Sequence, residues 1–391
     1  MGKTVRLIQV TESNNNKFYN MEELSDGSWK ATWGRVGSAG STKTYQSYEW
    51  NKKYNEKLSK GYSDVTELVS VAKAEKEYDL KVQNSDVKSF VEFLQKCAKQ
   101  TIKDNYLVDV SSVTQLQLDT AQSIVDHLVT LASHPLKINL INSKLLELYK
   151  TIPRKMSKVN NYLLNSPNFE FFQKLLDNEQ KLLDTLSTQV SNNKVEKKDV
   201  SVQDFGLDIE IASDEDRERI SKETDFKLTS KHRVFKVTNH KTEKNFANKK
   251  GKLLYHGSRN ENWWSILQTG LRIRPSGVIV TGSMFGASAI YFASKARKSL
   301  GYTSLRGSYW ASGSSNKAYL ALFDVYLGKQ WKLIDKNTSY QSWMSSLDYK
   351  KVRDKGYDST FAKGGADLVN DEYMIYTENQ CTIRYIIEIT N

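Results

Sequence analysis

Short runs of alternating apolar and polar residues fill the first 70 positions of the chain, and the longest extends from Thr4 to Thr11. Turn-forming serines and glycines separate it from three more β-like runs, which lie at 18–19, 29–33 and 42–45. The spacing then becomes helical from Tyr48 onward, with aromatic residues three to four positions apart. This part of the chain therefore predicts a small β-sheet backed by one helix.

Residues 84–190 place apolar side chains three and four positions apart, as amphipathic helices do. Four stretches show this spacing, at 87–94, 116–128, 143–150 and 169–186, and Pro153 follows the third as a break. The polar stretch 191–199 that comes next is typical of an exposed link. The pattern predicts an α-helical bundle.

From Val200 onward strand-like runs dominate and few helices are expected between them. The runs lie at 208–211, 234–237, 252–255, 318–325, 372–376 and 383–389. Because strands and helices do not alternate regularly, we predict a mostly antiparallel β domain within a multidomain α+β protein. Neither G-x-G-x-x-G nor G-x-x-x-x-G-K-S/T occurs, which argues against Rossmann and P-loop nucleotide sites.

Length and composition agree with several folded domains. The chain has 391 residues, of which 39% are hydrophobic and 26% charged, so apolar material is sufficient for ordinary cores. At about 100–200 residues per domain, this length predicts two to four domains. The sequence has no apolar run of about 18 residues and no signal-like start, so secretion and membrane insertion are disfavoured.

The formal charge of +12 lies mostly in residues 201–391 and favours an anionic partner or substrate. A soluble basic surface accounts for this charge equally well. The two cysteines, Cys97 and Cys381, are far apart, and the five histidines show no metal-binding spacing. We therefore expect a reducing compartment, no disulfide framework and no bound metal.

A short motif near the N-terminus, Trp33-Gly34-Arg35-Val36-Gly37, follows the segment 14–19 at a hairpin's distance. Together they resemble the WGR domain, the DNA-end-sensing module of the DNA-dependent poly(ADP-ribose) polymerases. The resemblance implies DNA contact by four residues, which are Asn16, Trp33, Gly34 and Arg35. The chemistry suits this role, since glycine lets a backbone approach phosphate and arginine can fork onto phosphate oxygens or onto a neighbouring domain.

Three motifs in the C-terminal part resemble the catalytic domain of the same family, and they lie at 253–259, 289–293 and 370–376. Their order and separation also match. The resemblance implies that His256, Tyr291 and Glu372 form the H-Y-E triad of ADP-ribosyl transfer. Breaking the bond between nicotinamide and ribose leaves an oxocarbenium-like sugar, which a carboxylate such as Glu372 stabilises. In the family this position is associated with polymer elongation.

Other residues acquire roles from the same resemblance. His256 is expected to bind ribose hydroxyls, and Gly257 to expose its main-chain groups to the nicotinamide amide. Ser299 is expected to bond the amide oxygen, while Tyr302 stacks on the ring opposite Tyr291. The adenosine half is assigned to Ser258 and Arg272.

Two stretches depart from the family pattern. The segment 284–291 has one residue more than expected, and Ser283 stands where the family often has an aromatic residue. The serine-, glycine- and tyrosine-rich stretch 307–315 is unfamiliar, and a flexible acceptor-side loop and a binding element are equally good interpretations.

The helical segments around 120–124 and 145–153 resemble the autoinhibitory domain that precedes the transferase fold. The domains are thus expected at 1–75 (WGR-like, DNA-sensing), 80–190 (regulatory helical) and 200–391 (catalytic ADP-ribosyltransferase). The resemblance implies a DNA-break-activated poly(ADP-ribose) polymerase of the DNA damage response, with NAD+ as co-substrate. Expected partners are DNA ends or nicks, poly(ADP-ribose), and acceptor proteins including the enzyme itself, and no membrane.

Two alternatives remain open. One is a mono-ADP-ribosyltransferase with the same donor site, and the other is a catalytically silent DNA-end-binding scaffold. The expected location is intracellular, nuclear in a eukaryote and otherwise in the cytoplasm or nucleoid.

Overall fold

The computed structural model describes residues 2–69, 79–108, 110–132, 135–193, 199–247, 249–273, 284–286, 288–365 and 367–391. The chain divides into two compact units. One contains Met1–Glu77 and Gln100–Glu196, and the other contains Tyr78–Lys99 and Lys197–Asn391. Each unit is discontinuous in sequence, because residues 79–99 fold with the C-terminal part of the chain.

The N-terminal sheet is antiparallel, with the strand order β4-β3-β2-β1-β5. Alternation along its strands buries one face, where Leu7, Met21 and Trp29 form a core with Trp50 from the helix. The predicted sheet and helix are confirmed. The elements are β1 (Thr4–Thr11), β2 (Asn15–Glu23), β3 (Trp29–Arg35), β4 (Ser41–Tyr45), α1 (Trp50–Ser59), β5 (Ser63–Asp64) and α2 (Thr66–Val69).

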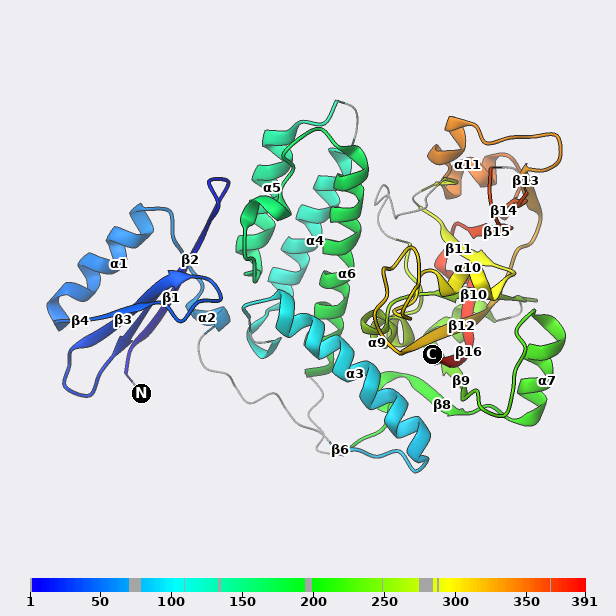
Figure 1. Cartoon of the computed structure of the whole chain (residues 1–391), viewed down its shortest axis with the longest axis horizontal. Helices are drawn as coiled ribbons and strands as arrows, with labels where there is room; N and C mark the ends of the chain where they lie inside the picture. The colour runs from blue at the N-terminus through cyan, green and yellow to red at the C-terminus, as the bar shows by residue number, and fades with distance from the viewer. Residues whose placement is uncertain are drawn as a thin grey trace. The chain divides into compact units, whose positions relative to one another are not determined.

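Four long helices follow, and they confirm the predicted amphipathic segments. They are α3 (Ser85–Asn105), α4 (Gln115–Thr130), α5 (Ile138–Thr151) and α6 (Phe169–Asn193). Helices α4, α5 and α6 stand side by side, with α4 in contact with both of the others (Figure 1). A capping box formed by Thr114 and Gln117 starts α4.

The C-terminal unit is built on a nine-stranded sheet with the order β13-β14-β15-β11-β10-β12-β16-β9-β8. All neighbours are antiparallel except β13 and β14, which confirms the predicted antiparallel β domain. The strands are β8 (Leu207–Ile211), β9 (Val234–Asn239), β10 (Lys252–Gly257), β11 (Ile290–Ala293), β12 (Lys317–Val325), β13 (Gln330–Ile334), β14 (Ser359–Ala362), β15 (Glu372–Ile375) and β16 (Cys381–Thr390). A separate parallel pair joins β6 (Asp79–Leu80) and β7 (Asp199–Val200).

Within the described residues, five helices lie among these strands, which is more than the apolar pattern suggested, because short helices leave only a weak periodic pattern. They are α7 (Asp214–Glu223), α8 (His240–Phe246), α9 (Asn260–Thr269), α10 (Ala296–Leu300) and α11 (Tyr349–Asp354). Successive residues of β10 face opposite sides of the sheet, so that Leu254 packs in one cluster with α9 while Leu253 and Tyr255 pack in another with α7 and α10.

The first part of α3 belongs to the core of the C-terminal unit. Phe90 stacks on Phe235 of β9 with ring centroids 4.2 Å apart, and it meets the edge of Tyr319 of β12 at 5.0 Å. Val87 and Leu94 lie in the same hydrophobic cluster. The apolar stripe that predicted a bundle helix therefore covers the nine-stranded sheet over residues 85–99.

None of the described helices is both long and apolar enough to span a bilayer. Both cysteines, Cys97 and Cys381, are free thiols. Within the described ranges no three histidine, cysteine or acidic side chains are grouped so that they could hold a metal ion.

Candidate active site

Three neighbouring strands carry the predicted triad. Strands β15, β11 and β10 are adjacent, and Glu372, Ala293 and Tyr255 are paired across them. Tyr291 lies two residues before Ala293, and His256 directly follows Tyr255. The sheet therefore places the three predicted residues at or within two positions of this line of paired residues, although they are far apart in sequence.

Glu372, the first residue of β15, forms an ion pair with Lys298 of α10. Both side chains are largely buried, with 12% and 14% of their surface exposed. Burial lowers the pKa of Lys298, and the neighbouring carboxylate opposes that shift. Sequence reasoning missed Lys298 as a site residue, and the available signal was its position directly before Ser299.

Tyr291 and Tyr302 both lie close to the charge of Glu372. Burial raises the pKa of Tyr302 to about 12 and that of Tyr291 well above its ordinary value. In both cases the Glu372 carboxylate adds to the rise. The Tyr291 hydroxyl accepts from the Phe285 N–H at 3.0 Å and donates to the Gly286 carbonyl at 2.9 Å. Tyr291 lies two residues from Ala293, the cross-strand neighbour of Glu372, and the charge of Glu372 acts on both tyrosines.

His256 is half-buried at the end of β10. Its Nδ1 lies 3.0 Å from the carbonyl oxygen of Tyr291. The edges or faces of Trp263, Phe292 and Phe323 surround the imidazole, with ring centroids 5.8–6.5 Å away. These contacts restrain the ring, as a group that positions a substrate requires.

Gly257 permits a close approach between β10 and α10. A Cβ at this position would lie 1.9 Å from the carbonyl oxygen of Ser299, which no side chain tolerates. Ser299 itself is 4% exposed. The structure therefore brings the two residues predicted to bind the nicotinamide amide into direct backbone contact.

The two residues predicted for the adenosine half, Ser258 and Arg272, follow β10 in the sequence. The Ser258 hydroxyl accepts a hydrogen bond from Asn262 of α9 at 3.1 Å. Arg272 is exposed, and the next residue, Ile273, donates its N–H to Glu378 at 2.9 Å. The departures from the family pattern at positions 283–291 include Ser283 and Ala287, and these two residues lie outside the described residues.

The four residues predicted to contact DNA lie where the start of β2 pairs with the end of β3 in the N-terminal sheet. Trp33 is half-buried and stacks on Tyr19, with ring centroids 6.0 Å apart. Gly34 allows tight hairpin closure, because a Cβ there would lie 2.8 Å from the Ser38 hydroxyl. Arg35 is exposed, whereas Asn16 is 1% exposed.

Arg35 and Asn16 bind the segment 156–159, which we term the connector. Arg35 Nε donates to the Ser157 carbonyl at 2.7 Å, and Asn16 donates to the Met156 carbonyl. Asn14 accepts from both Arg35 and the Val159 N–H, each at 2.9 Å. Arg35 therefore engages a neighbouring segment, one of the two partners expected for it.

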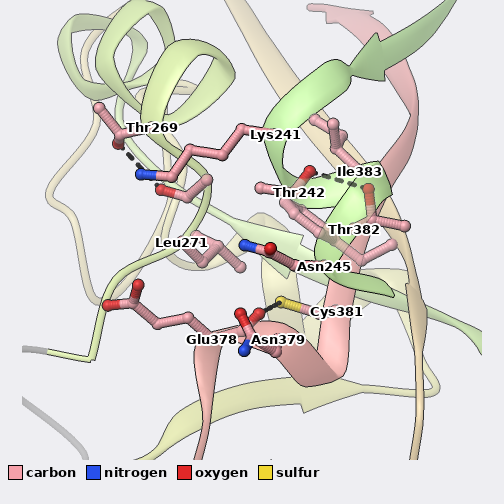
Figure 2. Close-up of a pocket in the computed structure, with 12 residues that line it drawn as sticks. Lys241, Thr242, Asn245, Thr269, Leu271, Glu378, Asn379, Cys381, Thr382 and Ile383 are labelled. Carbon is pink, nitrogen blue, oxygen red and sulfur yellow. Dashed lines mark hydrogen bonds between the residues drawn. The ribbon is translucent and has the colours of Figure 1, made fainter. Parts of the chain in front are cut away.

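A small cavity of about 20 Å³ lies among α8, the end of α9 and the start of β16 (Figure 2). The hydroxyls of Thr242 and Thr382 are 2.9 Å apart in its lining, and the Cys381 thiol donates to the Glu378 carbonyl at 3.7 Å. This volume holds about one water molecule. Its lining contains none of the predicted site residues, although Leu271 directly precedes Arg272.

Two known protein families match the N-terminal and C-terminal parts of the chain. The WGR domain family matches residues 3–69, and the poly(ADP-ribose) polymerase catalytic domain family matches residues 214–391. A putative poly [ADP-ribose] polymerase-like protein of Invertebrate iridescent virus 6 is 34% identical over 177 residues, which are 42% of this chain and 88% of the viral protein. Poly [ADP-ribose] polymerase 2 of Homo sapiens is 31% identical over 158 residues, 35% of this chain and 26% of the human protein.

A longer alignment covers nearly the whole chain. Poly [ADP-ribose] polymerase 1 of Danio rerio is 24% identical over 418 aligned residues, 96% of this chain and 40% of the fish protein. Together with the viral relative, this similarity shows that the chain belongs to the poly(ADP-ribose) polymerase family. It is an NAD+ ADP-ribosyltransferase, and NAD+ is its substrate.

Proposed function

We propose that this enzyme is activated by DNA breaks and elongates poly(ADP-ribose) on acceptor proteins, including itself. The observation that carries the proposal is the buried Glu372–Lys298 pair on β15 and α10, with Tyr291 and Tyr302 beside it. Such activity would take place where the DNA is, in a nucleus or a nucleoid.

Glu372 has the chemistry that ADP-ribosyl transfer requires. As nicotinamide leaves, positive charge develops on the ribose, and a fixed carboxylate in a partly dry site stabilises it. Lys298 supports that role, because its ion pair with Glu372 restricts the carboxylate to one position. The same carboxylate can orient the hydroxyl of an acceptor ribose, which is the step that lengthens a polymer.

The remaining predicted residues fit around the donor. Tyr291 and Tyr302 supply aromatic faces for nicotinamide, and Gly257 and Ser299 supply polar groups for its amide. His256 is held by three aromatic rings in a position suited to ribose hydroxyls. We assign Ser258 and Arg272 to the adenosine half.

We propose three functional parts, at 1–75, 80–190 and 200–391. The first senses DNA through Arg35, Trp33, Gly34 and Asn16, and the second regulates the third. Arg35 now bonds the carbonyl oxygen of Ser157 in the connector. DNA phosphate would compete for the same guanidinium, so that DNA binding alters the anchoring of the helical part. A ligand shifts such an equilibrium only by its difference in affinity for the two states.

Labelled NAD+ tests the proposal directly. The full chain is incubated with and without nicked DNA, and nicotinamide release and product length are both measured. We expect DNA to increase release and the product to be polymeric, whereas Glu372→Gln shortens the polymer or abolishes it. Glu210→Gln is the matched control, since Glu210 is exposed on β8.

The outcomes separate the alternatives. Single ADP-ribose units from the unchanged protein would indicate a mono-ADP-ribosyltransferase. Full-length polymer from Glu372→Gln would refute the role of this carboxylate, and equal turnover with and without DNA would refute break sensing.

A further inference from the structure

The segment after α10 presents two aromatic side chains to solvent. Tyr309 is 79% exposed and Trp310 is 57% exposed. They lie in the stretch 307–315, for which the sequence left open a flexible loop or a binding element. The hydrogen bonds within this stretch show whether the loop has a defined conformation.

Backbone hydrogen bonds close the loop on itself. The Arg306 N–H donates to the Ser315 carbonyl at 2.8 Å, and the Ser315 N–H donates to the Ser304 carbonyl at 2.9 Å. The Ser308 hydroxyl donates to the Thr303 carbonyl at 2.7 Å and accepts from the Gly313 N–H at 3.0 Å. The loop is therefore a built structure with a fixed shape.

Trp310 is anchored to the residues that surround the predicted nicotinamide pocket. The main-chain N–H groups of Trp310 and Ala311 both donate to the Gly301 carbonyl, at 3.0 and 3.1 Å. Arg259, which directly follows Ser258, donates to the Ala311 carbonyl at 3.0 Å. The backbone of Trp310 and Ala311 is thus tied to the C-cap of α10, and the Arg259 side chain ties Ala311 to the N-cap of α9.

The indole of Trp310 lies against the ring of Tyr302. Their centroids are 6.2 Å apart and their planes differ by 17°, an offset stack. A Cβ at position 301 would come within 3.1 Å of the indole, so Gly301 leaves space for it. Trp310 therefore covers part of Tyr302 and restricts the orientation of that phenol ring.

We propose that Trp310 is a positioning residue, which sets the plane of Tyr302 and thereby fixes one wall of the nicotinamide pocket. The proposal rests on the proposed role of Tyr302 in nicotinamide stacking. When the Tyr302 ring is already held in one orientation, less side-chain entropy is lost as nicotinamide binds. Loss of the indole weakens recognition of nicotinamide and leaves recognition of the ADP-ribose half unchanged.

The test uses the full chain with four variants, Trp310→Ala, Trp310→Phe, Tyr302→Ala and Trp343→Ala. Trp343 is the matched control, since it is 42% exposed and stacks on Trp331 with centroids 5.5 Å apart. Calorimetry measures the Kd of nicotinamide and of ADP-ribose, and steady-state kinetics with nicked DNA gives KM and kcat for NAD+.

We expect Trp310→Ala to raise the Kd of nicotinamide and the KM for NAD+ by about 2- to 10-fold, as the loss of one aromatic pair implies. The Kd of ADP-ribose and kcat should change less than about 2-fold on the same scale. Trp310→Phe should restore most of the loss, and Trp343→Ala should match the unchanged protein.

Three results would overturn the inference. If Tyr302→Ala weakens nicotinamide binding but Trp310→Ala does not, the positioning role of Trp310 fails while the proposed donor pocket stands. If Trp310→Ala weakens nicotinamide and ADP-ribose equally, its role is general folding. If Tyr302→Ala leaves nicotinamide binding intact, the proposed pocket itself is wrong and the inference fails with it.

Discussion

Arg154 and Glu179 form a buried ion pair whose removal should destabilise the helical part strongly. Both side chains are 2% exposed, and Arg154 Nη1 lies 2.5 Å from Glu179 Oε2. The guanidinium also lies over the ring of Tyr106, 4.8 Å from its centroid. Burial raises the pKa of Glu179, and the adjacent guanidinium opposes that rise.

The cost follows from what each substitution leaves behind. Glu179→Leu leaves a guanidinium buried without its carboxylate, and breaking such a pair costs about 3–5 kcal/mol. At about 2–4 °C per kcal/mol for a unit of this size, Tm should fall by about 6–20 °C. Arg154→Met should cost a similar amount, because it leaves the carboxylate unpaired. The double variant should lie within about 1 kcal/mol of the unchanged protein or exceed it, since no buried charge remains.

Urea unfolding of the full chain, followed by circular dichroism and analysed as a double-mutant cycle, measures these free energies of unfolding. Glu170→Leu on the same helix is the matched control, because Glu170 pairs with Lys174 on the surface, where its side chain is 77% exposed. That control should change stability by less than about 1 kcal/mol. A double variant as unstable as the two single losses combined would refute the reasoning.

Three further predictions concern the site and its regulation. Gly257→Ala should reduce NAD+ turnover by about 100-fold, because the new Cβ forces Ser299 to move; near-normal steady-state turnover would contradict the contact. Burial lowers the pKa of Lys298, so the pair with Glu372 is lost as pH rises through that lowered value, and turnover should decline at a lower pH than an ordinary lysine would give. Lys298→Arg should move that decline to higher pH in a pH profile of kcat/KM. Arg35→Ala should reduce stimulation by nicked DNA and leave basal turnover in place, and unchanged stimulation would count against DNA sensing.

The sequence predicts much of the fold, because periodicity records burial within one element. The strand expected at Thr4–Thr11 has those bounds, and the runs expected at 252–255 and 372–376 form β10 and β15, on either side of the strand β11 that carries Tyr291. Periodicity does not record which element covers a buried face. The helical stripe that contains Phe90 looked like part of the bundle, yet its first turns pack on the catalytic sheet.

Contacts between distant residues account for most of what the sequence did not predict. Lys298 meets Glu372 across 74 positions of sequence, and Arg35 meets Ser157 across 122. Neither pairing leaves a local pattern, because each depends on how strands and helices are brought together. The role of the 307–315 stretch was equally hidden, since its backbone bonds and the Trp310 stack follow from loop geometry.

Helix α3 determines where the C-terminal unit can be separated from the rest of the chain. A fragment that starts at residue 200 would lack Val87, Phe90 and Leu94, and it would expose the apolar rings of Phe235 and Tyr319 to water. Cutting the chain at residue 200 should therefore yield a product that aggregates, because this apolar surface is exposed. A fragment that keeps this core intact would begin before α3, at about position 79, because the C-terminal unit and the helical part are both built from this one helix.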